Sequence, residues 1–383
     1  MMTRDQAKRF FRGWIGCACA CVLLLPACGS ASGTWITLTE EDAGAYTVPV
    51  SEDAYTGSVR MTFLGDCTLG SEEKTARSSL GFPHVVEENG MGFPFRGLTG
   101  LTEGDDLTLA NLEVVLSGRP LKKEKKKFNF LGKPEYTEIL RQGSIECVTV
   151  ANNHTHDYGN EGYADTKAVL DEAGIAWLGT DAPAVWRSDD GLAIGFLGVN
   201  YSLTGNRFRR YEQQAQLLRD LGCSVLITIM HAGTEYSTNP PDNYQAQIVQ
   251  RASQVGCSLV IGHHPHVIQG WDMKDGMPVV YSLGNCSFGG TTFAKDSDAM
   301  VVQAELVFDA GRLQEIILTF RPISITSDAR HNNYSPRLLE GDEAKRALGK
   351  MEKSTGRSAG ERNGDGSATT VIHIHANADG TGD

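Results

Sequence analysis

Short apolar runs alternate with amphipathic segments along most of this chain, and this alternation constrains the fold more than any other feature of the sequence. The apolar runs have the length and composition of buried strands. The segments between them have helical spacing, and some end at a glycine, a common residue at a helix C-terminus. Strands that alternate with helices in this way are typical of an α/β fold. The expected strands are residues 59–64, 106–112, 145–150, 175–178, 192–199, 223–230 and 257–261, and the expected helices are residues 134–141, 163–173, 212–221 and 244–255.

The pattern changes after residue 270. Residues 277–283, 298–308 and 312–323 are again expected strands, but little helical sequence separates them. The turn Asp309-Ala310-Gly311 between the last two predicts an antiparallel hairpin. We therefore expect a mixed rather than a purely parallel sheet arrangement.

The residue types along the chain also predict its division into segments. Residues 29–58 are expected to form a tether and an irregular lead-in, and residues 59–337 the folded domain. A terminal helix is expected within residues 338–352. Residues 353–383 are rich in Gly, Ser, Asp, Asn and Thr, a composition that buries little apolar surface, so this tail is expected to be disordered.

The first 28 residues have the features of a secretory leader. A basic segment precedes an apolar one at residues 13–25, and small residues follow. Residues 25–28, Leu-Pro-Ala-Cys, resemble the lipobox of bacterial lipoproteins, in which the cysteine, here Cys28, becomes the acylated N-terminus. We expect an exported protein held at the outer face of the cell membrane by this lipid alone; the alternative is a plain leader cut nearby. After residue 30 no apolar run is long enough to span a bilayer.

Charge and cysteine content narrow the function further. A net charge of -12 and a pI near 5.3 argue against nucleic acid as a main partner. Four of the nine cysteines lie in the leader, and the remaining odd number are spread singly through apolar runs. They indicate core packing rather than a disulfide framework.

Side chains that can bind metals follow five of the expected strands. The carboxyl ends of parallel strands in one sheet meet at one edge, so residues far apart in the sequence are expected to converge there. Five such strand ends are hard to produce by core packing alone. The residues are Asp66, Glu113, Asn153 with His154, His231, and His264 with His266.

The segment Ile261-Gly262-His263-His264-Pro265-His266 holds three of the ten histidines in the chain. Pro265 biases His264 toward an extended conformation, in which residues i and i+2 face the same side. His264 and His266 are therefore expected to point together, and His263 away from them. The alternative is a pair of buried, hydrogen-bonded histidines without a ligand, but the concentration of histidine here favours a divalent metal.

Imidazole, carboxamide and carboxylate ligands together favour Mn, Zn or Fe over a metal bound by thiolates. Enough ligands are present for two ions. Two metals that share a bridging hydroxide can orient a water molecule for attack on phosphorus. Hydrolysis of a phosphoester is the first reaction that such a site predicts.

A basic run, Lys122–Lys127 (KKEKKK), stands apart from the rest of this acidic chain. Such a run is usually a solvated loop or hairpin, which is the favoured interpretation. The alternative is a surface that binds a polyanion rich in phosphate or carboxylate groups.

Six motifs, in order, resemble those of the CapA family of poly-gamma-glutamate capsule biosynthesis proteins. Through that family the chain is similar to the calcineurin-like metallophosphatases. The resemblance implies an α/β sandwich of two mixed β-sheets flanked by helices, with a dinuclear metal centre at strand ends. The motifs are GDCTLG (65–70), ANLE (110–113), ANNHTHDYGNEG (151–162), HAGTEY (231–236), IGHHPH (261–266) and YSLGN (281–285).

The resemblance also implies roles for individual residues. Metal ligands are implied at Asp66, Asn153, His154, His231, His264 and His266. Two positions depart from the ordinary metallophosphatase pattern. Thr68 stands where a histidine is usual, and Asn111 or Glu113 stands where a bridging aspartate is usual.

Neighbouring residues are candidates for supporting roles. His154 and Glu235 are the candidate catalytic groups, although Glu235 could instead orient His231. Asp157 could hold an imidazole or cap the following helix. Asn285 is expected to fix a loop beside the site, and Asn111 to support it.

Three functions are consistent with this sequence. The first is a surface-anchored, metal-dependent hydrolase of phosphoester bonds in capsule or envelope polymer metabolism, with an anionic polymer or a phosphoester as substrate. The second is a non-catalytic subunit of a poly-gamma-glutamate synthesis or export complex, which binds polymer or membrane partners on the same fold. The third is an amide-bond hydrolase or transferase that acts on the polymer.

Overall fold

The fold is described from a computed structural model of the chain, for residues 33–39 and 54–374. The expected leader and the lipobox Cys28 lie outside these residues. Within them, no helix combines the length and the apolar composition needed to cross a bilayer.

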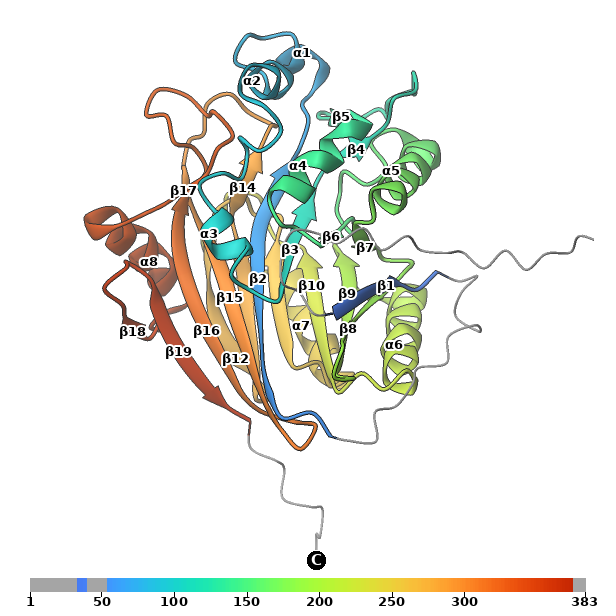
Figure 1. Ribbon diagram of the computed structural model, residues 1–383, viewed down its shortest axis with the longest axis vertical. Coiled ribbons are helices and arrows are strands. Elements are labelled where there is room, and N and C mark those ends of the chain that lie inside the picture. Colours follow the sequence, from blue (N-terminus) through green and yellow to red (C-terminus); the bar gives the residue numbers. More distant parts are fainter. Residues whose placement is uncertain (1–32, 40–53, 375–383) are drawn as a thin grey trace, which may run out of the picture.

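Two large mixed β-sheets form the centre of the molecule (Figure 1), as expected from the sequence. The first sheet is formed, in order, by β1 (Gly33–Thr37), β8 (Ala184–Ser188), β9 (Ala193–Asn200), β10 (Val225–His231), β11 (Leu259–His263), β13 (Met277–Leu283) and β12 (Ile268–Lys274). The second is formed by β18 (Glu361–Arg362), β19 (Ala368–His373), β16 (Arg312–Ser324), β15 (Asp298–Asp309), β2 (Gly57–Thr68), β3 (Leu107–Leu112), β6 (Cys147–Thr149) and β7 (Ala176–Leu178). Beside this path, β14 (Asn285–Phe288) pairs with β2 and β17 (Arg337–Leu338) pairs with β16, while β4 (Val115–Leu116) and β5 (Leu131–Gly132) form a separate pair.

The main core lies between the two sheets, and successive side chains of a strand point alternately into it and away from it. In β10, Val225, Ile227 and Ile229 enter the cluster shared with the second sheet. Leu226 and Met230 enter a cluster on the opposite face. This alternation is the period of two that a strand buried on both faces requires.

Helices cover the outer faces of both sheets. Apolar residues of α6 (Gly205–Asp220) and α7 (Asn243–Gln254) share a cluster with the first sheet. Those of α2 (Phe82–Asn89), α4 (Thr137–Gln142) and α5 (Gly159–Ala173) share a cluster with the second. The remaining short helices are α1 (Glu73–Ala76), α3 (Thr99–Thr102) and η1 (Pro134–Tyr136).

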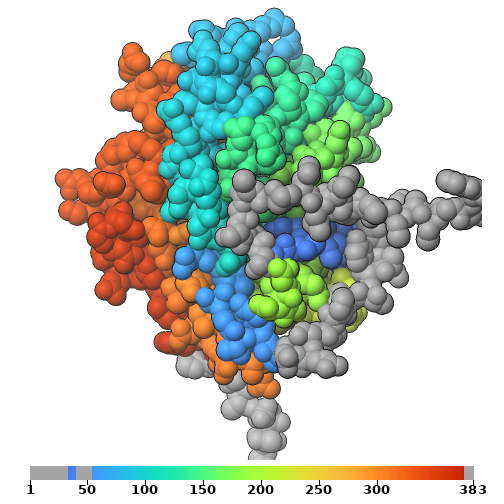
Figure 2. All heavy atoms as spheres, viewed as in Figure 1, coloured from blue at the N-terminus to red at the C-terminus, as the bar shows by residue number. Residues whose placement is uncertain are grey.

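The space-filling view shows what the chain after β2 adds to the surface. In Figure 2 the segment from α1 to α3, light blue and cyan, lies between the orange strands of the C-terminal half and the green region of α4 and α5.

The C-terminal part of the chain corrects one expectation. Residues 353–383 were expected to be disordered, but β19 pairs with β16 over six residues, and β18 pairs with β19. The preceding helix α8 (Gly341–Thr355) buries Ala344, Ala347, Leu348 and Met351 against the central core. Residues 353–374 are ordered because β16 offers an open sheet edge, a long-range feature that composition does not reveal.

The N-terminal lead-in also contains a strand. Residues 29–58 were expected to be irregular, yet β1 pairs antiparallel with β8. In contrast, the expected hairpin at residues 309–311 is present, because β15 and β16 pair antiparallel on either side of that turn.

Candidate metal centre

The expected ligands lie at strand ends, but these ends belong to both sheets. Asp66 lies in β2, and Glu113 directly follows β3. Asn153 follows β6 in the same sheet, whereas His231 ends β10 of the other. The expectation of a single sheet edge is therefore wrong: the residues meet where two sheets face each other. Two-sheet packing of this kind follows from long-range pairing and not from strand sequence.

One group of side chains surrounds His231. Its Nε2 atom lies 2.9 Å from Asn153 Oδ1 and 3.1 Å from His264 Nδ1. Glu113 Oε1 is 3.6 Å away. In Glu113, His231 and His264, one potential ligand atom each lies within 4.8 Å of the others, an arrangement that could hold a metal ion.

A second group surrounds Asp66. Its Oδ2 atom lies 3.2 Å from His266 Nδ1. Asp66, Glu113 and His266 also each provide one potential ligand atom within 4.8 Å of the others. Asn285 Oδ1 lies 2.8 Å from the same His266 nitrogen and so holds the ring in place.

Glu113 belongs to both groups and has the surroundings of a bridging ligand. Its side chain is fully buried, and neither carboxylate oxygen has a hydrogen-bond partner within the described part of the chain. A buried carboxylate without a partner is costly, and a cation removes that cost. The donor set of carboxylates, imidazoles and one carboxamide fits Mn, Zn or Fe. The residues present therefore fit a metal, and the position of Glu113 fits two neighbouring ions.

Asn111 and Thr68 stand at positions that depart from the ordinary metallophosphatase pattern. Both form hydrogen bonds beside the Glu113 carboxylate. Asn111 donates from Nδ2 to Asp66 Oδ1 at 2.8 Å, and the same nitrogen lies 3.2 Å from His231 Nδ1. Thr68 donates its hydroxyl to the backbone carbonyl of Glu113 at 3.2 Å. Asn111 thus supports Asp66, and Thr68 supports Glu113.

His263 lies in the site, contrary to the sequence argument. Its Nδ1 atom is 3.4 Å from Asp66 Oδ1, and the side chain is fully buried. The segment is not extended as expected, because His264 and His266 have φ angles of 98° and 58°. His264 and His266 nevertheless face the same region, with ring centroids 6.1 Å apart.

The buried charges shift one another's pKa values. Burial opposes ionisation of Asp66, but hydrogen bonds from His263 and His266 hold its pKa well below the usual range. Burial and the charge of Asp66 raise the pKa of Glu113. Burial would lower the pKa of His266, yet Glu113 and Asp66 raise it to about 10. For His231, burial and the neighbouring His264 lower the pKa.

His154 is oriented toward Glu113 by a chain of contacts. Its Nδ1 atom lies 2.7 Å from Asp157 Oδ2, which leaves Nε2 facing Glu113 Oε1 at 3.8 Å. Asp157 is fully buried and also accepts the backbone N–H of Phe130 at 2.6 Å. Of its two expected roles, Asp157 therefore holds an imidazole.

Lys126, from the basic run, reaches this chain of contacts. It forms an ion pair with Asp157 Oδ1 and donates to the backbone carbonyl of Asn153 at 2.9 Å. Its Nζ atom also lies 3.4 Å from His154 Nδ1. Sequence reasoning missed this role because a charge block predicts a solvated loop, and the residues of the run are indeed exposed. Among the other five residues, Glu124 donates its backbone N–H to the carbonyl of Asp157 at 2.8 Å.

Glu235 is exposed on the loop after β10 and belongs to neither group of potential ligands. Its charge raises the pKa of Glu113 and opposes the lowering of the His264 pKa. A role as a base stays a prediction.

Two mixed sheets with Asp, Asn, Glu and His side chains meeting between their strand ends define a metallophosphatase-like protein. The model of a family described as bacterial capsule synthesis protein PGA_cap matches residues 60–289, from β2 to β14. The chain belongs to this family, and the expected resemblance is confirmed.

Curated proteins of related description are similar to this chain. It is 26% identical over 304 residues to the capsule biosynthesis protein CapA of Bacillus anthracis, covering 73% of this chain and 70% of that protein. It is 26% identical over 258 residues to the PGA biosynthesis protein CapA of Bacillus subtilis, covering 62% of this chain and 65% of that protein. A third relative, described as a probable polyglutamine synthesis accessory protein of Mycobacterium tuberculosis, is 26% identical over 47% of this chain and 55% of its own length.

Proposed function

We propose that this chain is a metal-dependent hydrolase of capsule or envelope polymer metabolism, with the phosphoester bond as the first candidate for cleavage. The observation that carries the proposal is Glu113, a buried carboxylate that has no hydrogen bond within the described residues and that two groups of potential ligands share. Asp66, Glu113 and His266 would hold one ion. Glu113, His231 and His264, with Asn153, would hold the other. Bound divalent ions would supply an activated water and neutralise charge in the transition state.

The surrounding residues would control protons and position. With Nδ1 held by Asp157, His154 presents Nε2 to the centre and can hold or move a proton there. Lys126 keeps Asp157 and the Asn153 backbone in place. Asn111 and Asn285 fix Asp66 and His266. These contacts support a preorganised site that binds a substrate without large rearrangement.

Metal analysis and hydrolysis of a generic phosphodiester, bis(p-nitrophenyl) phosphate, test this function. The wild-type protein is expected to bind divalent metal and to cleave the ester, and His264→Ala is expected to bind less metal and to lose cleavage. His373→Ala, which changes a histidine on β19 far along the chain from the site, serves as the matched control. Absence of bound metal in wild type would overturn the proposal.

A second function is favoured by one relative's description as an accessory protein of polymer synthesis. In this second function the chain binds polymer or membrane partners and cleaves no bond. Bound metal without cleavage of a phosphodiester, or of the amide bonds of an oligo-gamma-glutamate, would support it over the hydrolase.

We further propose that the protein is exported and anchored through acylation at Cys28. The support is the basic and apolar leader followed by Leu-Pro-Ala-Cys. Cys28→Ala is expected to release the protein from the membrane fraction. Continued membrane association of this variant would exclude acylation at Cys28 as the anchor.

A further inference from the structure

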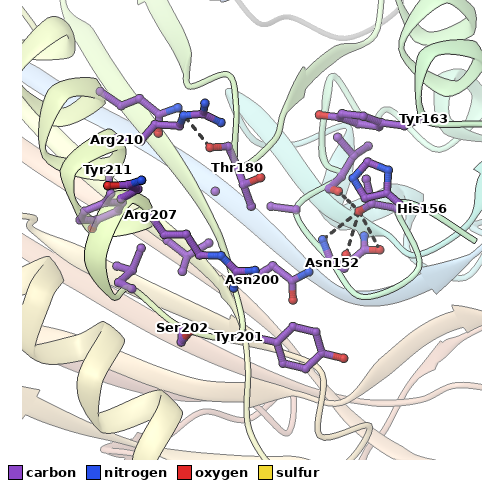
Figure 3. A pocket seen from close by; sticks show the side chains of 18 residues that line it. Asn152, His156, Tyr163, Thr180, Asn200, Tyr201, Ser202, Arg207, Arg210 and Tyr211 are labelled. Atoms are coloured by element: carbon purple, nitrogen blue, oxygen red, sulfur yellow. Dashed lines mark hydrogen bonds between the residues drawn. The ribbon is translucent and has the colours of Figure 1, made fainter. Parts of the chain in front are cut away.

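A cavity of about 390 Å³ lies beside the candidate metal centre. Its walls come from the loop after β6, the end of β9 and the first turns of α6 (Figure 3). Asn152 lines this cavity and also donates from Nδ2 to Asn111 Oδ1 at 3.1 Å, so the cavity adjoins the centre. The volume falls in the range of about 300 to 1,000 Å³ typical of small-molecule sites. We call it the β9 cavity.

Tyr201 lies between the β9 cavity and the centre. Its side chain lines the cavity, and its ring centroid lies 5.6 Å from that of His264. Its backbone N–H donates to the carbonyl of His231 at 3.1 Å, which fixes the residue beside both histidines. Figure 3 shows the Tyr201 ring pointing away from Arg207 and Tyr211. A group bound against this ring would therefore lie next to the potential metal ligands.

The conformation and exposure of Tyr201 are unusual for a tyrosine that only fills space. Its φ angle is 62°, in the left-handed region that bulky residues rarely adopt. The residue is 39% exposed, so packing of its ring offsets little of this strain. Strained residues of this kind cluster at sites that bind ligands. The exposed ring offers a stacking surface for a ring of the substrate.

The polar groups of the β9 cavity narrow the kind of ring. Most are neutral hydroxyl and carboxamide groups, which donate and accept hydrogen bonds, as the hydroxyl groups of a sugar do. Thr180 and Asn206 are exposed on these walls, and Arg207, next to Asn206 in α6, can donate to the same hydroxyl groups. A sugar ring also has an apolar face of C–H groups, which suits a tyrosine ring. The neutral groups belong to Asn152, Thr155, Thr180, Ser202, Asn206 and Gln214.

We propose that the β9 cavity binds a sugar ring, stacked on Tyr201, whose phosphoester lies at the metal centre. The inference rests on the proposed function, and it names the substrate class as sugar phosphates or phosphoester polymers that contain sugars. Tyr201 would then determine which group attached to phosphorus the site accepts.

Isothermal titration of the metal-loaded protein tests the proposal with two probes that cannot be hydrolysed. The phosphonate analogue of glucose phosphate carries the ring. The phosphonate analogue of glycerol phosphate has the same charged group and hydroxyl groups but no ring. Wild type is expected to bind the ring probe about fivefold more tightly or better, an effect of the size of one stacked aromatic contact.

Three variants assign this preference to the ring of Tyr201. Tyr201→Asn removes the ring and introduces a residue that tolerates the left-handed conformation, so the backbone beside His231 is kept. It is expected to reduce the preference to about twofold or less. Tyr201→Phe keeps the ring and is expected to retain the preference. Tyr244→Asn removes an exposed tyrosine at the start of α7, outside the cavity, and is expected to behave as wild type.

Failure of this proposal is distinguishable from failure of the hydrolase. Chelation of the metal should weaken both probes by the same factor, because they share the phosphonate group, and should leave the preference for the ring. Equal affinity of wild type for the two probes would overturn the inference, whether or not the ester is cleaved in the hydrolysis assay. An unchanged preference in Tyr201→Asn, with unchanged thermal unfolding, would also overturn it. A preference for the analogue of adenosine phosphate over that of glucose phosphate would do the same, because the cavity would then bind a nucleobase.

Discussion

Glu113 shows how a single residue can carry the chemistry of a site. Leaving a buried polar group without a partner costs about 1 to 3 kcal/mol, and more for a charged one. Burial and Asp66 raise its pKa, so in the metal-free protein a proton reduces that cost. A metal ion would replace the proton at this carboxylate, whose oxygens have no hydrogen-bond partner within the described residues.

We predict that Glu113→Gln separates metal binding from stability. The variant should gain little or no thermal stability from divalent metal, whereas wild type should gain about 3 to 4 kcal/mol at saturating metal. Without metal, the variant should be at least as stable as wild type, because it buries an amide instead of an unpaired carboxyl group. Thermal unfolding with metal and with chelator measures both effects. An equal metal-induced gain in variant and wild type would refute the bridging role.

Lys126 gives a second prediction for a single residue. Lys126→Ala removes the ion-pair partner of the buried Asp157 and should lower the free energy of unfolding by about 1 to 3 kcal/mol. Burial is the main cause that lowers the pKa of His154. The charge of Asp157 raises this pKa, whereas the charge of Lys126 lowers it. The variant should therefore raise the pKa of His154, which NMR titration of the histidine can follow. Lys125→Ala, an exposed neighbour in the same run, should change neither quantity.

At the level of elements, β19 is the strand whose presence the tail composition did not suggest. Ile372 is 9% exposed and packs on the central core, whereas the adjacent Val371 is 49% exposed on the other face. Ile372→Ala should lower the free energy of unfolding by about 2 kcal/mol or more, and Val371→Ala by less than about 0.5 kcal/mol. Chemical denaturation compares the two. Similar small losses in both variants would mean that β19 contributes no core packing.

The start of β6 gives a pH prediction. Burial, opposed by the Thr108 backbone N–H, raises the pKa of Glu146 from 4.5 to about 8. Because the folded pKa exceeds the unfolded one, the protonated side chain favours folding; this contribution is complete below about pH 4.5 and is lost as the pH rises to about 8. Glu146→Gln should flatten the pH dependence of unfolding between these values, since its amide oxygen can still accept from Thr108. If the free energy of unfolding of Glu146→Gln depends on pH as steeply as that of wild type and of the exposed control Glu135→Gln, the raised pKa of Glu146 is contradicted.

Across the whole molecule, the candidate metal centre joins the two sheets. Asp66, Glu113 and Asn153 come from the sheet of β2, β3 and β6, while His231 and His264 come from the sheet of β10 and β11. Elsewhere the sheets are held by apolar contacts of the central core and by hydrogen bonds between Thr37 of β1 and Trp177 of β7. The site is thus a polar contact between the two halves of the sandwich.

Divalent metal should therefore stabilise both halves together. In hydrogen exchange, metal is expected to slow exchange in the loops after β3 and β6 and also in the loops after β10 and β11. The chelated protein is the reference for each peptide. Protection confined to one sheet would show that the ion does not bridge them.

Much of the fold follows from local pattern. The helices α5 to α8, the hairpin at residues 309–311 and most strands of the two sheets were predictable, because burial with a period of two or 3.6 depends on nearby residues. The predicted strands are β2, β3, β6, β7, β9, β10, β11, β13, β15 and β16, whereas β8 and β12 were not predicted. The pairing of β1 with β8 and of β19 with β16 was not, because a strand at a sheet edge depends on a partner far along the chain.

By itself, the sequence determined which side chains stand at strand ends, since residue type and apolar period fix both locally. Only the tertiary structure decided that these ends belong to two sheets, that His263 lies against Asp66, and that Lys126 reaches His154. It alone also created the cavity lined by the loop after β6, the end of β9 and α6. The physical reason is that burial, charge coupling and cavities arise from contacts between segments that are distant in sequence, and no local period encodes those contacts.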